Sequence, residues 1–329
     1  MKLKEILLFG ATGQIGRNLI RKLSKNNYKI IAVTRNIHKA GYILKTQANP
    51  GYLKLVELKT FDLNKIDELI KNCSICINLV GILYEKKKNH FKLIHTELPN
   101  LLSQLAKKHK LDKFIHLSAL GVERANDSLY ALSKLEGEKK IIENFSKYII
   151  LKPSIVYSVD DNFTTTFMSL LSKLPIMPLY YNGETKFSPI HVTDLVDIIY
   201  EMIETKKNSL TLECIGPEVL SFKEMLQKLL KLIQKKRILL PLPIQIANIS
   251  AKILQILPDP LLTEDQLRLL KYDNVPSGKY KTNSDIGMPS KRYFNDEVKK
   301  YCYMWREGGQ FSTEKYTSNN DLKNKSSEN

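Results

Sequence analysis

Residues 5–18 read EILLFGATGQIGRN, an apolar run followed by three glycines spaced three residues apart. The run EILLF predicts a buried strand, and NLIRKLSKN at 18–26 has the pattern of a helix, so Gly10, Gly13 and Gly16 occupy the turn between them. In such a turn the first glycine permits the tight bend, the second lets a pyrophosphate approach, and the third allows close packing of helix on sheet. The N–H groups at the start of the helix then face the phosphates. The stretch therefore predicts a bound dinucleotide.

The first half of the chain alternates short apolar runs with amphipathic stretches. We expect strands at 5–10, 29–34, 52–58, 74–81, 113–119 and 148–154, with helices near 14–25, 36–46, 64–71, 90–109 and 130–145. Regular alternation of this kind gives a parallel sheet with helices on both faces. With right-handed crossovers, the predicted fold class is α/β, a doubly wound Rossmann sheet.

The second half has a different pattern, in which prolines separate shorter elements. Helices are expected near 163–173, 193–205, 221–235, 244–257 and 263–271. The sequence thus predicts an NADP(H)-binding Rossmann domain at 1–155 and a smaller, mostly helical cap at 156–311, with elements that return to the sheet. Residues 312–329 have almost nothing to bury and are expected to be disordered.

Composition and charge indicate which partners and which location to expect for this protein. No stretch reaches the ~18 uncharged apolar residues that a membrane-spanning helix needs. The formal net charge is +17, but lysines are spread along the chain without a nucleic-acid motif, so acidic membrane or protein surfaces are favoured over nucleic acid as partners. The first strand begins almost at Met1, which leaves no room for a targeting segment. The expected location is the cytoplasm, with the cytoplasmic face of the inner membrane as a peripheral alternative.

Cys73 and Cys76 form a CxxC pair within an apolar stretch that reads as a buried strand. Because no second CxxC exists and Cys214 and Cys302 stand alone, we interpret all four as small apolar residues of a reduced compartment. No metal site is predicted.

Charge at the end of the second strand indicates which dinucleotide binds. An NAD site normally has an acidic residue there, but this strand ends in Thr34-Arg35, and no acidic residue occurs between Glu5 and Glu57. A guanidinium pairs well with a phosphate dianion. We therefore predict NADP(H) rather than NAD(H), with Arg35 on the 2′-phosphate and Arg17 as second choice. The other basic residues of the first helix are interpreted as a solvated face.

Two further strand ends supply candidate cofactor contacts. Asp62, followed by Leu63, ends the third strand; its carboxylate could accept from the adenine amino group or cap the next helix. Asn78, Val80 and Gly81 end the fourth strand beside the expected path of the cofactor.

The stretch YALSK places Tyr130 and Lys134 four residues apart, on one face of a helix. An ammonium there can lower the pKa of the phenol and hold the nicotinamide ribose, so that the tyrosine acts as general acid/base. Ser118, at the end of the fifth strand, is the candidate for orienting a substrate carbonyl. These three residues are the predicted catalytic set.

The glycine loop, the strand-five serine and YxxxK together resemble the short-chain dehydrogenase/reductase superfamily over about residues 4–215. KPSIVY at 152–157 and FSPIHVTDLV at 187–196 resemble its extended and atypical branches, where the KPS turn lies near the nicotinamide. In that context His191 is expected to pack where the chain crosses the sheet and not to act as a base.

INLVGILYE at 77–85 and the run from PLP at 241–243 through LPDPLLTEDQLRLLKYDNV at 257–275 resemble a narrower family. It is the alpha-subcomplex subunit 9 family of respiratory complex I (NADH dehydrogenase, ubiquinone), a nucleotide-binding accessory subunit, with its bacterial relatives. Its members hold NADPH tightly, without an established reaction in the complex. The resemblance implies that the cofactor is surrounded by Gly10, Thr12, Gly13, Gln14, Ile15, Gly16, Arg35, Asp62, Val80, Tyr130, Lys134 and Pro153.

Two functions remain open at this point. In one, the protein holds NADP(H) structurally or as a redox sensor, with complex I or the inner-membrane surface as partner. In the other, it is an active oxidoreductase or epimerase/dehydratase acting on a small molecule such as a quinone precursor, isoprenoid or sugar nucleotide. The segment 244–257 carries the single charge of Lys252 and reads either as a buried cap helix or as a helix lying on a membrane.

Overall fold

The computed structural model describes residues 5–255, 260 and 262–311, apart from the side chains of residues 244, 250 and 253. Its centre is an eight-stranded sheet in the order β14-β11-β6-β5-β4-β1-β2-β3, in which every pairing is parallel. The strands are β1 (Glu5–Phe9), β2 (Lys29–Thr34), β3 (Leu53–Glu57), β4 (Ile75–Asn78), β5 (Lys113–Leu117), β6 (Tyr148–Pro153), β11 (Leu210–Cys214) and β14 (Lys281–Thr282). The predicted doubly wound fold is confirmed.

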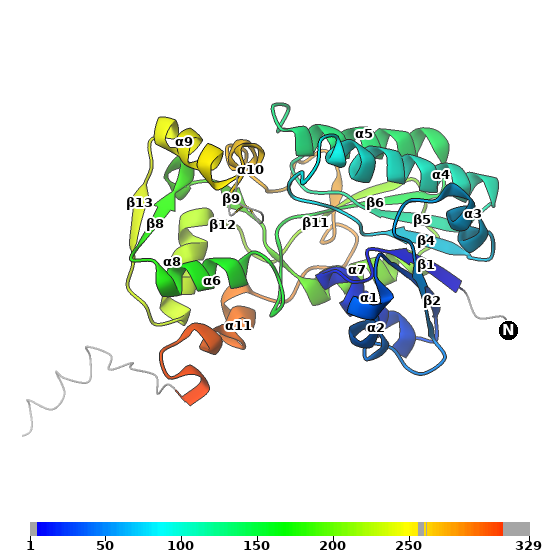
Figure 1. Cartoon of the computed structure of the whole chain (residues 1–329), viewed down its shortest axis with the longest axis horizontal. Coiled ribbons are helices and arrows are strands. Elements are labelled where there is room, and N and C mark those ends of the chain that lie inside the picture. Colours follow the sequence, from blue (N-terminus) through cyan, green and yellow to red (C-terminus); the bar gives the residue numbers. More distant parts are fainter. Residues whose placement is uncertain (1–4, 256–259, 261, 312–329) are drawn as a thin grey trace, which may run out of the picture.

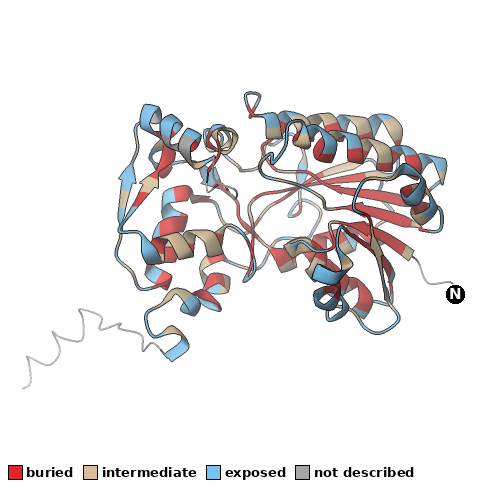
Figure 2. Cartoon of the chain, viewed as in Figure 1, coloured by how far each residue is buried: buried red, intermediate tan, exposed pale blue. Residues whose placement is uncertain are grey.

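Helices cover both faces of this sheet (Figure 1). One face carries α1 (Gln14–Lys25), α2 (Ile37–Lys45) and α7 (Val192–Glu204); the other carries α3 (Leu63–Lys71), the π-helix η1 (Lys92–Glu97), α4 (Leu98–Lys108) and α5 (Leu129–Asn144). Successive residues of β1 point to opposite faces of the sheet. Ile6 and Leu8 pack toward α1, while Leu7 and Phe9 pack toward α4. Because both faces are covered, the central strands β1, β4, β5 and β6 are buried and read as continuous apolar runs, whereas the edge strand β3 is mostly half-buried (Figure 2).

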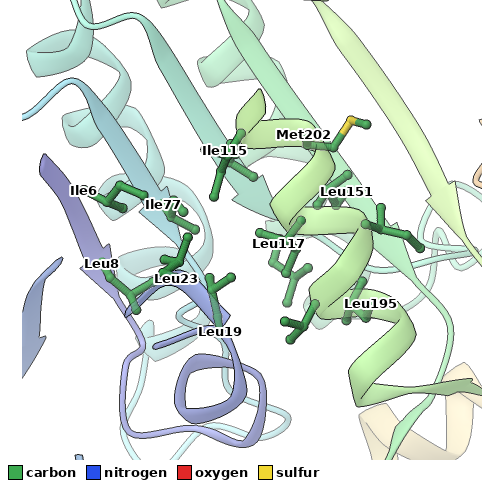
Figure 3. Packing of buried hydrophobic residues seen from close by; sticks show 14 of the residues in the cluster. Ile6, Leu8, Leu19, Leu23, Ile77, Ile115, Leu117, Leu151, Leu195 and Met202 are labelled. Carbon is green, nitrogen blue, oxygen red and sulfur yellow. The ribbon is translucent and has the colours of Figure 1, made fainter. Parts of the chain in front are cut away.

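The chain returns to the sheet after leaving it. α7 packs beside α1, and Figure 3 shows Leu195 and Met202 of α7 over Leu117 and Leu151 of the sheet. β11 then extends the sheet beyond β6, and β14 pairs with β11 at the edge. The Rossmann layer is therefore completed by segments from the second half of the sequence.

The cap has its own core around Tyr157, Phe222 and Phe294. Its helices are α6 (Thr164–Lys173), α8 (Phe222–Leu232), α9 (Ile244–Leu254), α10 (Glu264–Leu269) and α11 (Phe294–Lys299), with 3₁₀ turns at Tyr180–Gly183, Cys302–Trp305 and Gly309–Phe311. Its strands form two-stranded sheets: β8 (Ile176–Leu179) with β13 (Ile238–Pro241), β9 (Lys186–Phe187) with β12 (Leu220–Ser221), and β7 (Val156–Tyr157) with β10 (Ile190–His191). α10 lies near the start of α5, at the end of the sheet that faces the cap (Figure 1).

Within the described residues, no helix has the length and apolarity to cross a membrane, and no group of three potential metal-ligating side chains comes together. All four cysteines are buried thiols without a disulfide. The tail predicted to be disordered, 312–329, lies outside the described residues, as do 256 and 257 of the predicted helix 244–257.

Candidate cofactor and reaction site

The glycine loop has the geometry that its spacing predicts. Gly10 has φ +82°, a conformation that favours glycine, and a Cβ there would lie 2.8 Å from the Leu79 carbonyl carbon. A Cβ on Gly16 would lie 2.3 Å from the Gly10 oxygen, so this glycine lets α1 approach the turn. At Gly13 a Cβ would meet only the Gly10 oxygen, at 3.5 Å. The middle glycine therefore borders open space, where a pyrophosphate needs to approach.

The start of α1 is suited to an anion. Gly13 is its N-cap, no side chain caps it, and its first turn holds no acidic residue. The N–H groups of Gln14, Ile15 and Gly16 thus lack acceptors from the helix itself. Thr12 is exposed beside them. Gln14 donates to the Ser158 hydroxyl at 2.8 Å, which ties the glycine loop to the segment after β7.

Arg17 has a different partner from the one proposed for it. Its guanidinium pairs with the Asp160 carboxylate and donates to the Thr12 carbonyl oxygen. The sequence could not show this, because Asp160 lies 143 residues further along the chain. We therefore no longer assign Arg17 to a 2′-phosphate.

Arg35 follows β2, is exposed, and makes no hydrogen bond or ion pair within the described part of the chain. The expectation that no carboxylate lies nearby needs correction. Strand pairing sets Glu57 opposite Thr34, and the Glu57 carboxylate accepts from the Ile37 N–H at 2.8 Å. This bond lowers the pKa of Glu57, which therefore caps α2 as a carboxylate.

A hollow of about 300 Å³ lies past the end of β3, where the adenine is expected. It is lined by Glu57, Leu58, Lys59, Thr60, Asp62 and Lys65. One oxygen of Asp62 caps α3 by accepting from the N–H groups of Asn64 and Lys65, at 3.0 and 3.2 Å. Its other oxygen has no hydrogen bond among the described residues, so the N-cap interpretation is confirmed and an adenine contact is still available. Leu63 is 54% exposed at the same helix start.

The turn after β4 lies at the end of the site where Tyr130 and Lys134 are found, which we call the reaction end. Asn78 is fully buried; its side chain accepts from the Val80 N–H at 3.1 Å and lies 3.2 Å from His116 Nδ1. It therefore shapes the turn from inside, whereas Val80 and Gly81 are partly exposed. A Cβ on Gly81 would lie 3.4 Å from Lys134 Nζ, so this turn and α5 meet.

Tyr130 and Lys134 lie on α5, as predicted. Lys134 is 3% exposed, and its ammonium donates to the Leu117 carbonyl oxygen at 3.1 Å. Burial lowers the pKa of Lys134 to about 8. Burial and then the Asp265 carboxylate raise the pKa of Tyr130, and its hydroxyl makes no hydrogen bond to the described residues. Lys134 Nζ keeps donor capacity toward a ribose, while the phenol is held protonated.

Ser118 has a different partner from the one predicted. Its hydroxyl donates to the Glu138 carboxylate, which also accepts from Lys152 Nζ at 2.6 Å. Lys152 is fully buried and pairs with Glu123 as well. A buried ammonium needs such partners, and the Ser118 hydroxyl is drawn into the same network. Ser118 therefore acts as part of this internal network and not as a group presented to a substrate.

Ala119, the residue after Ser118, shares a packing environment with Tyr130. Both lie against a small apolar cluster of Val122, Ala125 and Ala131, joined by Leu269 and Tyr272 of the cap. Ala119 has no hydroxyl. The expected Ser–Tyr–Lys arrangement is thus complete in sequence but not in space.

His95 organises this region, although nothing in the sequence pattern indicates it. It lies in the π-helix η1, is fully buried, and accepts from the Ile82 N–H at 3.1 Å. Its ring meets Tyr130 edge-on, with 5.2 Å between centroids. Burial lowers the pKa of His95 to about 2, so it stays neutral and holds the turn after β4. A π-helix often marks a functional site, but it has no sequence signal.

Asp265 is a second residue whose role is not evident from the sequence. Its carboxylate accepts from the Ser128 hydroxyl at 2.8 Å and from the N–H groups of Leu129 and Tyr130 at 2.7 and 3.1 Å. A carboxylate is stabilised at a helix N-terminus. The cap is therefore fixed to the helix that carries Tyr130 and Lys134. In the sequence, Asp265 belongs to the LTEDQ run at 262–266, which indicates a family resemblance but no role for this residue.

Two residues of the extended-branch motifs lie near this site. The Pro153 carbonyl oxygen accepts from the Leu120 N–H at 2.9 Å, which joins the KPS turn to the segment after β5. His191 caps α7 through the Thr193 N–H and packs against Tyr157, at 5.2 Å between rings. This placement agrees with the expected packing role of His191.

A dinucleotide fits these residues: the open Gly13, the uncapped start of α1, the hollow at Asp62 and the Lys134 ammonium follow one another along the carboxyl ends of the strands. A family model described as the NAD dependent epimerase/dehydratase family matches residues 6–214. The chain belongs to this family, and an NAD-type nucleotide is its cofactor class.

Two curated proteins that are similar to most of this chain are subunits of NADH-ubiquinone oxidoreductase. The NADH-ubiquinone oxidoreductase 40 kDa subunit of Neurospora crassa is 25% identical over 286 residues, covering 85% of this chain and 74% of that protein. NADH dehydrogenase [ubiquinone] 1 alpha subcomplex subunit 9 of Arabidopsis thaliana is 24% identical, covering 92% and 78%. The resemblance to this subunit family is therefore confirmed.

Among solved structures, UDP-glucuronic acid 4-epimerase from Bacillus cereus, in complex with UDP-glucuronic acid and NAD, superposes with a TM-score of 0.68. It is 19% identical and covers 91% of this chain and 98% of its own. An identity of 19% establishes a shared fold and nothing more. Because 91% of this chain is covered, the shared fold includes the cap.

Proposed function

We propose that the protein binds NADP(H) and holds it without regular turnover, as a nucleotide-binding accessory protein of the complex I type. The observation that carries this proposal is the state of the strand-five serine. Its hydroxyl is bonded to Glu138, and the next residue, Ala119, which has no hydroxyl, packs against the same apolar cluster as Tyr130. A general acid/base tyrosine lacks its hydroxyl partner in this arrangement, whereas the uncapped start of α1, Arg35 and one oxygen of Asp62 are open to a dinucleotide.

The preference for NADP(H) rests on Arg35. It is exposed at the end of β2 without an ion-pair partner among the described residues, so it is free to pair with a 2′-phosphate. Glu57 is the carboxylate that could oppose this preference. One oxygen of its carboxylate is bonded to the Ile37 N–H at the start of α2, and the other lies 3.7 Å from Lys59 Nζ, so both oxygens have partners that compete with a ribose hydroxyl.

Association with a respiratory complex is supported by the relatives. Two proteins that match most of this chain are named as subunits of NADH-ubiquinone oxidoreductase. The chain's excess of positive charge suits an acidic partner surface. We propose that complex I, or an assembly related to it, is the partner.

An active NADP-dependent oxidoreductase or epimerase is the second candidate. Tyr130 and Lys134 favour it, because they occupy the acid/base and ribose-holding positions on α5, and a bound nicotinamide would supply hydride transfer there. Its substrate class would be a sugar nucleotide, isoprenoid or quinone precursor.

The deciding experiment starts with the nucleotide that accompanies the purified protein. Stoichiometric NADP(H) that exchanges slowly with labelled cofactor and is not consumed by UDP-sugars or quinones supports the holding function. Rapid exchange and consumption by one of these substrates supports the second candidate. A protein that arrives empty and binds neither NADPH nor NADH when titrated would overturn both.

A further inference from the structure

The outer edge of the cap, formed by β8, β13 and α9, lies at the end of the molecule far from the Rossmann sheet (Figure 1). β8 and β13 pair there with Ile176 opposite Ile238, and α9 begins two residues after β13 ends. Met177 and Leu179 of β8 are buried in the cap, whereas the alternate positions are exposed. We call this set the rim face; it consists of Leu174, Ile176, Ile238, Leu240, Ile246 and Ile249.

These side chains have no cover within the described structure. Ile238 is 62% and Ile249 is 59% exposed. In α9, Ala247 and Ala251 face the cap core, so the small residues are inside and the large ones are outside. Isolated exposed apolar residues are normal, but a group on adjacent elements marks a surface that something else covers.

Charge around the rim face indicates what covers it. Residues 162–183 and 225–258, which contain the whole rim face, include no Asp or Glu. Lys173 and Lys236 are exposed and form no ion pair within the described part of the chain. Arg237 donates to the carbonyl oxygens of Leu171 and Ser172, which holds β13 at the end of α6. Two acids from outside these segments pair with lysines within them, Glu264 with Lys252 and Glu307 with Lys235.

We propose that the rim face lies on an anionic lipid bilayer. Its apolar side chains enter the boundary between headgroups and acyl chains, while Lys173 and Lys236 contact lipid phosphates. A second copy of the chain is a poorer occupant, because a symmetric contact would bring the same lysines together. No described helix can span the membrane, so the attachment is peripheral. This location adds to the proposed function and does not depend on it, since the cofactor site lies in the other domain.

Vesicle flotation tests the proposal with the full chain. We expect it to float with vesicles of phosphatidylglycerol and phosphatidylcholine, more weakly with phosphatidylcholine alone, and less as salt is raised. Ile249→Glu and Ile238→Glu should each weaken binding about tenfold or more, because an apolar side chain worth about 1.5 kcal/mol of burial is replaced by a charge. The matched control is Ile142→Glu on α5, which is 48% exposed outside the rim face and should bind as the unchanged protein does.

Thermal unfolding and NADPH titration of each variant show that it is folded, independently of lipid. The proposal is overturned if the unchanged protein does not float with anionic vesicles, or if Ile142→Glu weakens binding as much as Ile249→Glu. It is also overturned if sedimentation shows a dimer that Ile249→Glu dissociates, because the face then belongs to a second copy. In each of these cases the cofactor experiments still decide the proposed function.

Discussion

The two ends of the cofactor site differ in what their polar groups are already bonded to. At the nucleotide end, the start of α1 is uncapped, Arg35 has no ion-pair partner among the described residues, and one oxygen of Asp62 is free. At the reaction end, Ser118 is bonded to Glu138, and Asp265 occupies the start of α5. The nucleotide end keeps several groups open to a ligand, whereas at the reaction end Ser118 and the start of α5 are satisfied internally, and the Tyr130 hydroxyl and part of the donor capacity of Lys134 stay open.

The difference between the two ends matters because dinucleotide binding and catalysis need different groups, although the same fold supports both functions. Dinucleotide binding needs only backbone donors, space and a few side chains, and these are present. Proton transfer needs a positioned hydroxyl and a phenol whose pKa is near working pH, and here burial and Asp265 raise the pKa of Tyr130. Within one family, a nucleotide site can therefore persist while the reaction end becomes structural.

The largest expected effect concerns the glycine loop. Gly16→Ala places a Cβ 2.3 Å from the Gly10 oxygen, so α1 must move away from the turn. We expect at least about a hundredfold weaker NADPH binding, together with a loss of about 2 kcal/mol in the free energy of unfolding. Fluorescence titration and denaturant unfolding measure the two quantities.

Gly13→Ala is the matched control, because its Cβ has only the Gly10 oxygen near it, at 3.5 Å. It should weaken NADPH binding while the free energy of unfolding stays within about 0.5 kcal/mol of the unchanged protein. If Gly13→Ala binds NADPH normally, the cofactor does not approach this loop and the description of the nucleotide end is wrong.

Asp265→Ala tests the reaction end. It removes the acceptor for the Ser128 hydroxyl and for two N–H groups at the start of α5. We expect the free energy of unfolding to fall by about 2 kcal/mol, and by less in Asp265→Asn, which keeps one oxygen acceptor. Equal stability of Asp265→Ala and the unchanged protein would show that the cap is not fixed to α5 in this way.

The pH dependence of cofactor affinity tests Lys134. Its pKa of about 8 in the folded protein means that the ammonium is lost as pH rises through 8, so NADPH affinity should fall there, by up to about tenfold at pH 9. Because the unfolded lysine keeps its proton to higher pH, the free energy of unfolding of the cofactor-free protein should rise over the same window. Lys134→Met should show neither change. A flat affinity profile for the unchanged protein would contradict this assignment.

The smallest expected effect concerns cofactor choice. Arg35→Asp should lower affinity for NADPH about tenfold relative to NADH, through the loss of one exposed charged contact to the 2′-phosphate. Arg21→Asp on α1 is the control, because Arg21 bonds to Gln47 and should leave the ratio unchanged. An unaltered ratio in Arg35→Asp would place the 2′-phosphate elsewhere or favour NAD(H).

Local pattern was enough to predict the glycine loop at the nucleotide end. The glycine loop, the strands and the pair Tyr130–Lys134 depend on neighbours within a few residues, and they lie as expected. Alternation along the strand also separates neighbouring residues: β5 ends at Leu117, Ser118 bonds to Glu138 of α5, and Ala119 packs against the same apolar cluster as Tyr130.

The remaining features depend on residues that are distant in sequence. Glu57 reaches α2 through strand pairing, Asp160 meets Arg17, and Asp265 caps α5 from the cap. Each is an ordinary surface acid when read alone. Only the order of the strands and the docking of the cap bring these charges to their partners, so neither composition nor spacing could indicate them.

The most direct test of the central claim is a single-turnover measurement on protein loaded with stoichiometric NADPH. UDP-hexoses, quinones and aldehydes are added in excess, and the absorbance of the reduced nicotinamide is followed, with exchange against labelled NADPH measured in parallel. The account predicts slow exchange and no oxidation by any of these substrates. Stoichiometric oxidation by one of them, abolished in Tyr130→Phe, would contradict it.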